Sequence, residues 1–271
     1  MGQAKKPSLS PRTADKFALY QSSIQGPEIV EFLERRFRIV TGRPPRLFRE
    51  DFCATALNCC EFVKLHPENR ALGVDLDESA LRWCLKNNYP RLKEGEWQRI
   101  TLLKGNVLTV RTSPVDLIAA LNFSYCVFKS RTRLLTYFGN VRKSLTKEGI
   151  LVLDVNGGPD VLSGDVYRKR TKEFVYICEG DPVDAITHDA KVKIHFQFAN
   201  KSILRNAFVY DWRLWTLPEL VEALEESGFR NVHVLWQKNV KTNSPAGVFR
   251  RASSARGTSY RMWVAYVVAQ L

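Results

Sequence analysis

Apolar runs of strand length alternate with amphipathic segments of helix length in the middle of the chain. The apolar runs predict buried strands and lie at 47–50, 71–75, 99–103, 115–121 and 149–155. The segments between them predict helices at 56–65, 77–88 and 132–145, the last of them closed by Thr146 and Gly149. Strands that alternate with helices form a parallel sheet covered on both faces, so the pattern predicts an α/β fold.

The pattern changes to strict alternation near residue 190. Apolar and polar residues alternate over 191–198, which predicts that His195 lies on a polar face, and a second extended run follows at 203–215. Two extended runs joined by turn residues predict an antiparallel hairpin inserted into the α/β scheme.

The carboxyl-terminal part returns to the α/β pattern. Thr216 and Glu219 have the spacing of a capping box at the start of a helix, and Gly228 follows the end of that helix. Apolar runs at 231–236 and 263–271 predict the final strands.

The composition is that of a globular chain without a membrane-spanning segment. The 271 residues are 45% hydrophobic and 25% charged, and no stretch reaches the roughly 18 uninterrupted apolar residues of a membrane helix. The sequence has no basic start followed by an apolar segment, as a secretory signal requires. We therefore expect a cytoplasmic protein with a disordered basic tail over 1–15 and one domain over 16–271.

The charge is basic and unevenly spread. The chain carries 41 Lys and Arg against 28 Asp and Glu, a net charge of +13, which favours anionic partners such as RNA. Segments 168–172 and 241–262 concentrate the excess, so a polyanion would dock there. A basic, solvated surface explains the same charge without a partner.

Cysteine and histidine spacing does not predict a metal site. The six cysteines form no CxxC pair, and four of them lie in apolar runs, as buried thiols of a reducing compartment do. The four histidines are scattered along the chain. We therefore expect no metal ligands.

One predicted strand ends in a turn of small residues that opens a helix. The stretch reads LFREDFCATALNCCEF over 47–62, and Asp75 ends the next predicted strand. Small side chains let the backbone approach a nucleotide, and a carboxylate at the end of the second strand can accept both hydroxyl protons of a ribose. The arrangement favours nucleotide binding.

These motifs resemble those of the class I S-adenosylmethionine-dependent methyltransferases. The first motif of that family runs apolar-apolar-acid-x-Gly-Cys-Gly-Thr-Gly; here Glu50 takes the position of the acid, and residues 53–56 match Cys-Gly-Thr-Gly. Phe52, Ala54 and Ala56 replace the three glycines. Alanine permits close approach if its φ stays negative, whereas Phe52 implies a differently shaped turn.

The resemblance extends over about residues 40–271, because KGNVL (104–108), LTKEGILVLDV (145–155) and the segment 216–236 follow in the order of the family. It implies a Rossmann-like sheet of seven strands with the last strand antiparallel. It also implies a helical cap over 16–43 and an inserted hairpin region over 160–215 on the acceptor side.

The resemblance further implies a binding site for S-adenosylmethionine, whose product is S-adenosylhomocysteine. Asp75 would bind the ribose, or serve as a helix N-cap; Glu50 would orient the methionine amino group, or cap the next helix. Arg49 would pair with the methionine carboxylate, or only with Glu50 or Asp51. Asn106 would contact adenine, or form a turn. The implied cofactor-binding residues are Tyr20, Arg49, Glu50, Cys53, Ala54, Thr55, Asp75, Leu76, Asn106, Val107, Leu121 and Asn122.

The acceptor side has four candidate catalytic residues, in two places. Asn122 and Tyr125 follow the fourth predicted strand, where some amino-methylating enzymes carry Asn/Asp-Pro-Pro-Tyr/Phe, with Ser124 at a position of proline. The favoured interpretation is a loop that packs against the cofactor. Tyr210 and Asp211 lie in the hairpin and suit an acceptor pocket or a cluster at a sheet edge.

The sequence thus predicts methyl transfer from S-adenosylmethionine to an N or O atom of a small-molecule or side-chain acceptor. Methyl transfer from a sulfonium is an in-line displacement that needs geometry more than a triad or a metal. One alternative is an RNA amino-group methyltransferase. Another is a non-catalytic protein that keeps the cofactor fold and binds nucleic acid or a partner.

Overall fold

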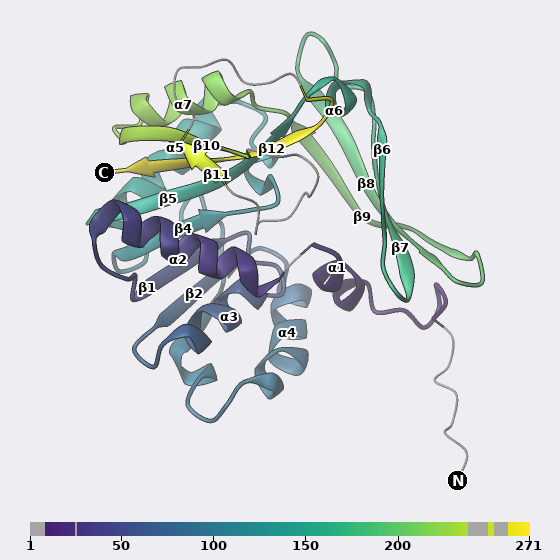
Figure 1. Cartoon of the computed structure of the whole chain (residues 1–271), viewed down its shortest axis with the longest axis horizontal. Helices are drawn as coiled ribbons and strands as arrows, with labels where there is room; N and C mark the ends of the chain where they lie inside the picture. The colour runs from purple at the N-terminus through teal and green to yellow at the C-terminus, as the bar shows by residue number, and fades with distance from the viewer. Residues whose placement is uncertain (1–8, 25, 238–248, 252–259) are drawn as a thin grey trace.

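A mixed eight-stranded sheet forms the centre of the molecule (Figure 1). The computed structural model describes residues 9–24, 26–237, 249–251 and 260–271. The order of strands is β11-β10-β12-β5-β4-β1-β2-β3. Their bounds are β1 (Leu47–Asp51), β2 (Arg70–Asp75), β3 (Ile100–Lys104), β4 (Val115–Ala120), β5 (Leu145–Gly157), β10 (Arg230–Gln237), β11 (Phe249–Arg251) and β12 (Trp263–Gln270).

The strand directions confirm the predicted Rossmann-like sheet with an antiparallel last strand. β3, β2, β1, β4 and β5 pair in parallel, whereas β12 is antiparallel to both β5 and β10. The short β11 adds an eighth strand at the edge, beyond the predicted seven. All residues of β4 are buried, as expected for a parallel strand covered on both faces.

Helices cover both faces of this sheet. On one face, α2 (Pro27–Thr41), α3 (Leu57–Leu65) and α4 (Glu78–Asn87) form one hydrophobic core with the strands. On the other, α5 (Arg131–Lys143) and α7 (Leu217–Glu226) form a second core. Shorter elements are α1 (Lys16–Ile24), α6 (Pro159–Ser163), η1 (Tyr89–Arg91), η2 (Trp97–Arg99) and η3 (Ser124–Val127).

The predicted helix boundaries hold at α7 and fail at α5. The capping box of Thr216 and Glu219 begins α7, and Gly228 follows its end with a φ of 90°. α5 ends earlier than predicted, with Ser144 as its C-cap. Thr146 and Gly149 belong to β5 and do not close a helix. The pairing of β4 with β5 shifts register in this part of the strand.

The predicted hairpin is part of a larger, four-stranded antiparallel sheet, seen at the right of Figure 1. β8 (Asp189–Phe198) and β9 (Ile203–Arg213) confirm the hairpin, and β6 (Val166–Arg170) and β7 (Phe174–Gly180) extend it. A register shift after Ile194 leaves His195 only 4% exposed, so its predicted polar, solvated position is wrong.

α1 connects the inserted sheet to the main domain. Phe17 packs against Trp83 of α4 and against Phe208 of β9, with ring centroids 6.2 and 5.9 Å apart. Leu19 enters the core of the inserted sheet. Asp15, within the segment we expected to be a tail, accepts a hydrogen bond from Trp83 Nε1. Residues 1–8 lie outside the described residues.

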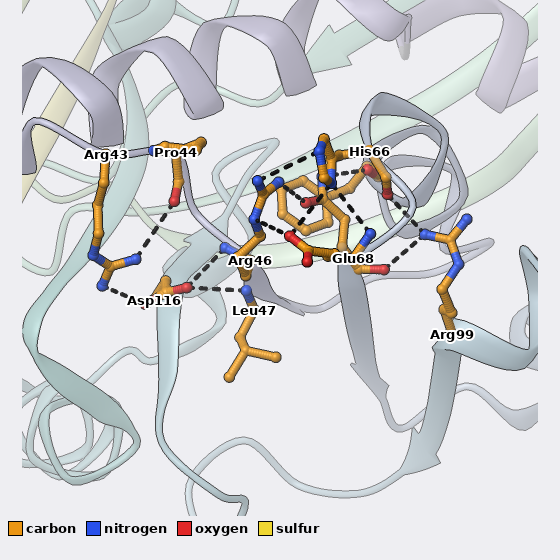
Figure 2. Close-up of polar contacts among 10 residues, drawn as sticks. Arg43, Pro44, Arg46, Leu47, His66, Glu68, Arg99 and Asp116 are labelled. Atoms are coloured by element: carbon orange, nitrogen blue, oxygen red, sulfur yellow. Dashed lines mark hydrogen bonds and ion pairs between the residues drawn. The ribbon is translucent and has the colours of Figure 1, made fainter.

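At the amino-terminal edge of the parallel strands, polar side chains satisfy one another (Figure 2). Asp116 accepts the backbone N–H groups of Arg46 and Leu47 (2.8 and 3.1 Å) and a hydrogen bond from Arg43 Nη2 (2.9 Å). Arg46 in turn pairs with Glu68. The network fixes the start of β1 against β4 and leaves the opposite edge of the sheet for the site.

Candidate functional site

A cavity of about 210 Å³ opens at the carboxyl-terminal ends of β1, β2 and β4. Ligands of open α/β sheets bind at this edge. The walls come from α1, the turn after β1, the end of β2, the turn after β4 and strand β9. The lining residues are Phe17, Tyr20, Phe52, Ala54, Thr55, Asp75, Asp77, Ala80, Asn122, Ser124, Val127, Phe208, Tyr210 and Trp212.

The turn after β1 keeps the backbone shape of a glycine-rich turn without glycine. Phe52, Ala54 and Ala56 have φ values of 59°, 47° and 49°, all in the left-handed region. The condition of a negative φ at the alanines is therefore not met. Instead Cys53 Sγ lies against Gly73 of β2, where a Cβ would come within 2.9 Å of the sulfur. Gly73 thus lets the turn approach β2 closely, and Cys53 has a packing role.

Two carboxylates line this cavity, Asp75 and Asp77, and Asp75 ends β2. Its Oδ2 accepts the backbone N–H of Ala54 (2.7 Å), and its Oδ1 accepts that of Asp77 (2.8 Å). Burial raises the pKa of Asp75, although these hydrogen bonds oppose the shift. Each oxygen keeps a further lone pair, since a carboxylate has about four acceptor sites.

Glu50 and Arg49 point to opposite faces of β1, and neither lines the cavity. Glu50 is buried and accepts from Asn58 Nδ2 (2.6 Å), and burial raises its pKa to about 8. Arg49 is fully buried and pairs with Asp51 (2.7 Å). The expected pairing of Arg49 with a methionine carboxylate therefore has no geometric support, and the alternative pairing with Asp51 is the one observed.

Leu76, Asn106 and Val107 do not line the cavity. Leu76 follows Asp75 and is 65% exposed. Asn106 Oδ1 accepts the backbone N–H of Leu108 (2.9 Å), which is the turn interpretation, and Val107 is buried in the core. Thr55 lines the cavity with its hydroxyl bonded to Gln21 Oε1 (2.7 Å).

The turn after β4 separates Asn122 from Tyr125. Asn122 lines the cavity, whereas Tyr125 is 1% exposed and donates its hydroxyl to the backbone carbonyl of Asp154 (2.8 Å). Leu121 is buried, and its carbonyl accepts from Ser124 Oγ (2.7 Å). The favoured interpretation, that this loop packs against the cofactor, fits Asn122 but not Tyr125, because η3 turns the Tyr125 ring into the core.

A second cavity, of about 300 Å³, lies between the inserted sheet and the main domain. It shares four wall residues with the first cavity: Tyr20, Asn122, Tyr210 and Trp212. Its remaining lining residues are Ile24, Phe123, Asn156, Asp160, Val161, Asp165, Val166, Tyr167, Arg168, Tyr176, Cys178, Gly180, Asp181, Ala190, Val192, Ile194, Leu214 and Met262.

Tyr210 and Trp212 form the shared wall, and Asp211 does not. The rings of Tyr210 and Trp212 stack with centroids 4.7 Å apart. Asp211 alternates to the other face of β9, where it pairs with Lys129 (2.6 Å), so its expected place at the acceptor is wrong. Tyr20 hydrogen-bonds Tyr210 across the junction, and burial raises the pKa of Tyr20 well above its ordinary value and that of Tyr210 to about 12.

Several lining residues were missed by the sequence analysis. Phe208 shares a face of β9 with Tyr210, a period-two signal that the sequence carries. Tyr167 and Tyr176 come from β6 and β7, which were not predicted as strands. Gln25 and most of the basic segment 241–262 lie outside the described residues.

Two further observations concern the described part of the chain. No group of three or more His, Cys, Asp or Glu in it is arranged to hold a metal ion. Its helices are too short or too polar to cross a membrane.

Searches with protein-family models and with curated protein sequences find no match. Solved structures are similar over nearly the whole chain. DesVI of Streptomyces venezuelae is 17% identical, with a TM-score of 0.67 over 94% of this chain and 97% of that one. The sugar N-methyltransferase KedS8 of Streptoalloteichus sp. ATCC 53650 is 14% identical, with a TM-score of 0.64 over 100% and 98%.

An S-adenosylmethionine-dependent methyltransferase of Clostridium acetobutylicum ATCC 824 is 17% identical, with a TM-score of 0.62 over 93% of this chain and 94% of that one. The chain therefore has the Rossmann-like fold of the class I S-adenosylmethionine-dependent methyltransferases. At these identities the likeness defines the fold.

Proposed function

We propose that the protein transfers a methyl group from S-adenosylmethionine to an N or O atom of a small molecule. The observation that carries the proposal is the pair of adjoining cavities with Tyr20, Asn122, Tyr210 and Trp212 in both walls. A group-transfer enzyme needs this arrangement, because donor and acceptor must meet in line with water excluded.

The first cavity fits the cofactor. Asp75 keeps acceptor sites for the two ribose hydroxyls, and the left-handed turn at 52–56 brings the backbone close to the cavity. Leu76, beside Asp75, offers exposed apolar surface that the adenine ring would cover. When bound, S-adenosylmethionine supplies a methyl group on a sulfonium. Several similar structures are of methyltransferases, one of them with S-adenosylmethionine bound, which supports this assignment.

The second cavity fits a small acceptor. Its ionisable side chains, apart from the tyrosines and Cys178, are Asp160, Asp165, Asp181 and Arg168. Asp160 pairs with Arg261 and Asp181 with Lys193, which leaves Asp165 and Arg168 with opposite charges, so the charges of the lining are balanced. A lining with balanced charges favours a neutral acceptor over a strongly charged one. The likeness to a sugar N-methyltransferase supports an amine of a small molecule.

The shared tyrosines orient the acceptor. Because burial raises the pKa of Tyr20 and Tyr210, both phenols are protonated at neutral pH and can donate hydrogen bonds. They do not serve as bases. A neutral amine can attack a sulfonium without a base, so positioning and desolvation are the contributions expected of this chain.

The RNA alternative has less support. It rested on Asn122 to Tyr125 and on the basic charge, but Tyr125 is buried away from both cavities. The non-catalytic alternative rested on the lost glycines, yet the turn keeps its left-handed backbone.

Calorimetry with S-adenosylmethionine and S-adenosylhomocysteine tests the proposal first. We expect both to bind with one site per chain. Methyl incorporation from labelled cofactor is then measured with panels of small amines and alcohols and with RNA. A folded chain that binds neither cofactor form would overturn the proposal, and selective methylation of RNA would replace the acceptor class.

A further inference from the structure

The turn that carries Asn122 is held in an unfavourable backbone conformation. Asn122 and the next residue, Phe123, have φ values of 56° and 58°. Two consecutive left-handed residues with side chains are uncommon, and such backbone persists only where the surroundings fix it. Asn122 lines both cavities, so whatever fixes this turn also fixes the junction between them.

One buried carboxylate binds both amides of the turn. Asp154 of β5 is 7% exposed; its Oδ2 accepts the N–H of Asn122 (2.7 Å) and its Oδ1 that of Phe123 (2.9 Å). Its own carbonyl accepts the hydroxyl of Tyr125 (2.8 Å). β5 is the neighbour of β4 in the sheet, so Asp154 ties the end of β4 to a fixed strand.

We propose that Asp154 is a positioning residue that holds Asn122 at the junction of the two cavities through the backbone N–H groups of Asn122 and Phe123. The functional meaning of this junction rests on the proposed methyl transfer. The clamp itself rests only on the contacts above.

The clamp requires the ionised carboxylate. An ionised carboxylate accepts at both oxygens, whereas protonation turns one oxygen into a donor that faces an N–H group. Burial raises the pKa of Asp154 to about 7, against the hydrogen bonds from Phe123 and Asn122. The protonated form therefore gains population as the pH falls through about 7. The clamp weakens on the acid side.

The titratable neighbours of Asp154 stay protonated in this range. They are Tyr125 and Cys126 of η3 and Tyr266 of β12, and burial raises the pKa of each. Glu50, with a pKa of about 8, titrates in the same range but is bonded to Asn58 of α3. Because Glu50 also titrates near this range, a variant of Asp154 is needed to show that a titration midpoint near pH 7 belongs to Asp154.

Nuclear magnetic resonance of the wild-type chain makes the first test. The amide shifts of Asn122 and Phe123, followed from pH 5.5 to 8.5, should move together with a midpoint near 7. In Asp154→Asn this titration should vanish. Hydrogen exchange of the same two amides should become about tenfold faster than in the wild type at pH 8, since an amide supplies only one acceptor oxygen.

Asp116→Asn is the matched control, because Asp116 accepts two backbone N–H groups at the opposite end of β4. It should leave the amides of Asn122 and Phe123 unchanged. S-Adenosylhomocysteine affinity should fall about fivefold in Asp154→Asn, within the range of one lost hydrogen bond, and stay constant in Asp116→Asn.

Wild-type amides that do not titrate, or an Asp154→Asn chain that keeps their protection, would overturn the clamp. If Asp154→Asn lost the protection of these amides but kept the wild-type affinity for S-adenosylhomocysteine, the role of the clamp at the junction would be overturned. A wild-type chain that binds no S-adenosylhomocysteine would refute the proposed function, and amide exchange would still decide the clamp.

Discussion

At both edges of the parallel strands, carboxylates accept pairs of backbone N–H groups, but they do so for different purposes. At the amino-terminal edge Asp116 accepts two backbone N–H groups and also pairs with Arg43. At the carboxyl-terminal edge Asp75 and Asp154 each accept two backbone N–H groups, with no ion pair to either among the described residues. Burial opposes ionisation at all three, yet the pKa of Asp116 is lowered while those of Asp75 and Asp154 are raised.

This difference separates Asp116, a structural carboxylate, from Asp75, which lines the first cavity and is available to a ligand. Asp154 lines neither cavity and acts through the backbone of the turn. A carboxylate with a cation and two amides has its acceptor sites satisfied and contributes to stability. A desolvated carboxylate without a cation gains more from a ligand that donates to it. The comparison predicts that variants of the two edges have opposite effects on stability and binding.

The largest effect is expected at the amino-terminal edge. Asp116→Ala would leave two backbone N–H groups and Arg43 without their acceptor, so unfolding free energy should fall by about 3 kcal/mol. Urea denaturation measures this change. The affinity for the cofactor, measured under conditions in which the variant is folded, should stay at the wild-type value. A variant that keeps its stability but loses much of its affinity would show that Asp116 serves binding and not stability.

The same residue has a pH dependence. Although burial opposes it, hydrogen bonds from Arg43 and from the amides of Arg46 and Leu47 lower the pKa of Asp116 below its ordinary value of 3.8. A lowered folded-state pKa stabilises the fold above the unfolded value, and this contribution is lost as the pH falls through the folded value. The stability difference between wild type and Asp116→Ala should therefore shrink below about pH 4.

At the other edge, Asp75→Ala should weaken S-adenosylhomocysteine binding by about ten- to a hundredfold, or roughly 1.4–2.8 kcal/mol. The cause is the loss of hydrogen bonds from the ribose hydroxyls to a charged acceptor. Calorimetry on the folded variant measures the effect, and Asp116→Asn serves as the control for removal of a distant carboxylate. Unchanged affinity would remove Asp75 from the cofactor site.

The order of elements was predictable, whereas the direction of single side chains was not. Continuous apolar runs and a capping box give the strands and α7 because burial and capping have local sequence signals. Arg49 and Asp211 sit one residue from Glu50 and Tyr210, and one step along a strand reverses the face. The period of a strand separates its two faces but does not say which face, if either, meets a cavity.

Backbone conformation was the second feature that could not be predicted from the sequence. The sequence replaces the glycines of the turn after β1, and an alanine gives no local sign that its φ is positive. The contacts that fix this shape come from β2: its pairing with β1, the close contact of Gly73 with Cys53, and the hydrogen bond that Asp75 accepts from the N–H of Ala54. β6 and β7 line the second cavity and the core of the inserted sheet. They were missed because β6 has only two apolar residues in five, and the apolar residues of β7 do not alternate with polar ones.

A smaller effect is expected at Asn122. Asn122→Ala should lower S-adenosylhomocysteine affinity by about fivefold, or roughly 1 kcal/mol, because Asn122 lines the first cavity and tolerates left-handed backbone better than alanine. Asn122→Gly keeps the backbone shape and removes only the amide. Wild-type affinity in both variants would count against the cofactor role and revive Asn122 as a residue that orients a planar amine acceptor.

The smallest effect concerns the strained turn itself. Ala54→Gly should stabilise the protein by about 0.5–1 kcal/mol, because relief of the left-handed strain exceeds the added chain entropy of glycine. Ala56→Gly is the matched variant: its φ is similar, but its methyl group is fully buried, so lost packing should cancel the gain. Denaturation of the two variants side by side measures the difference. If Ala54→Gly instead gave no gain in stability, as expected for Ala56→Gly, the cost of left-handed alanine at this edge would be negligible, and the turn would owe its shape to packing alone.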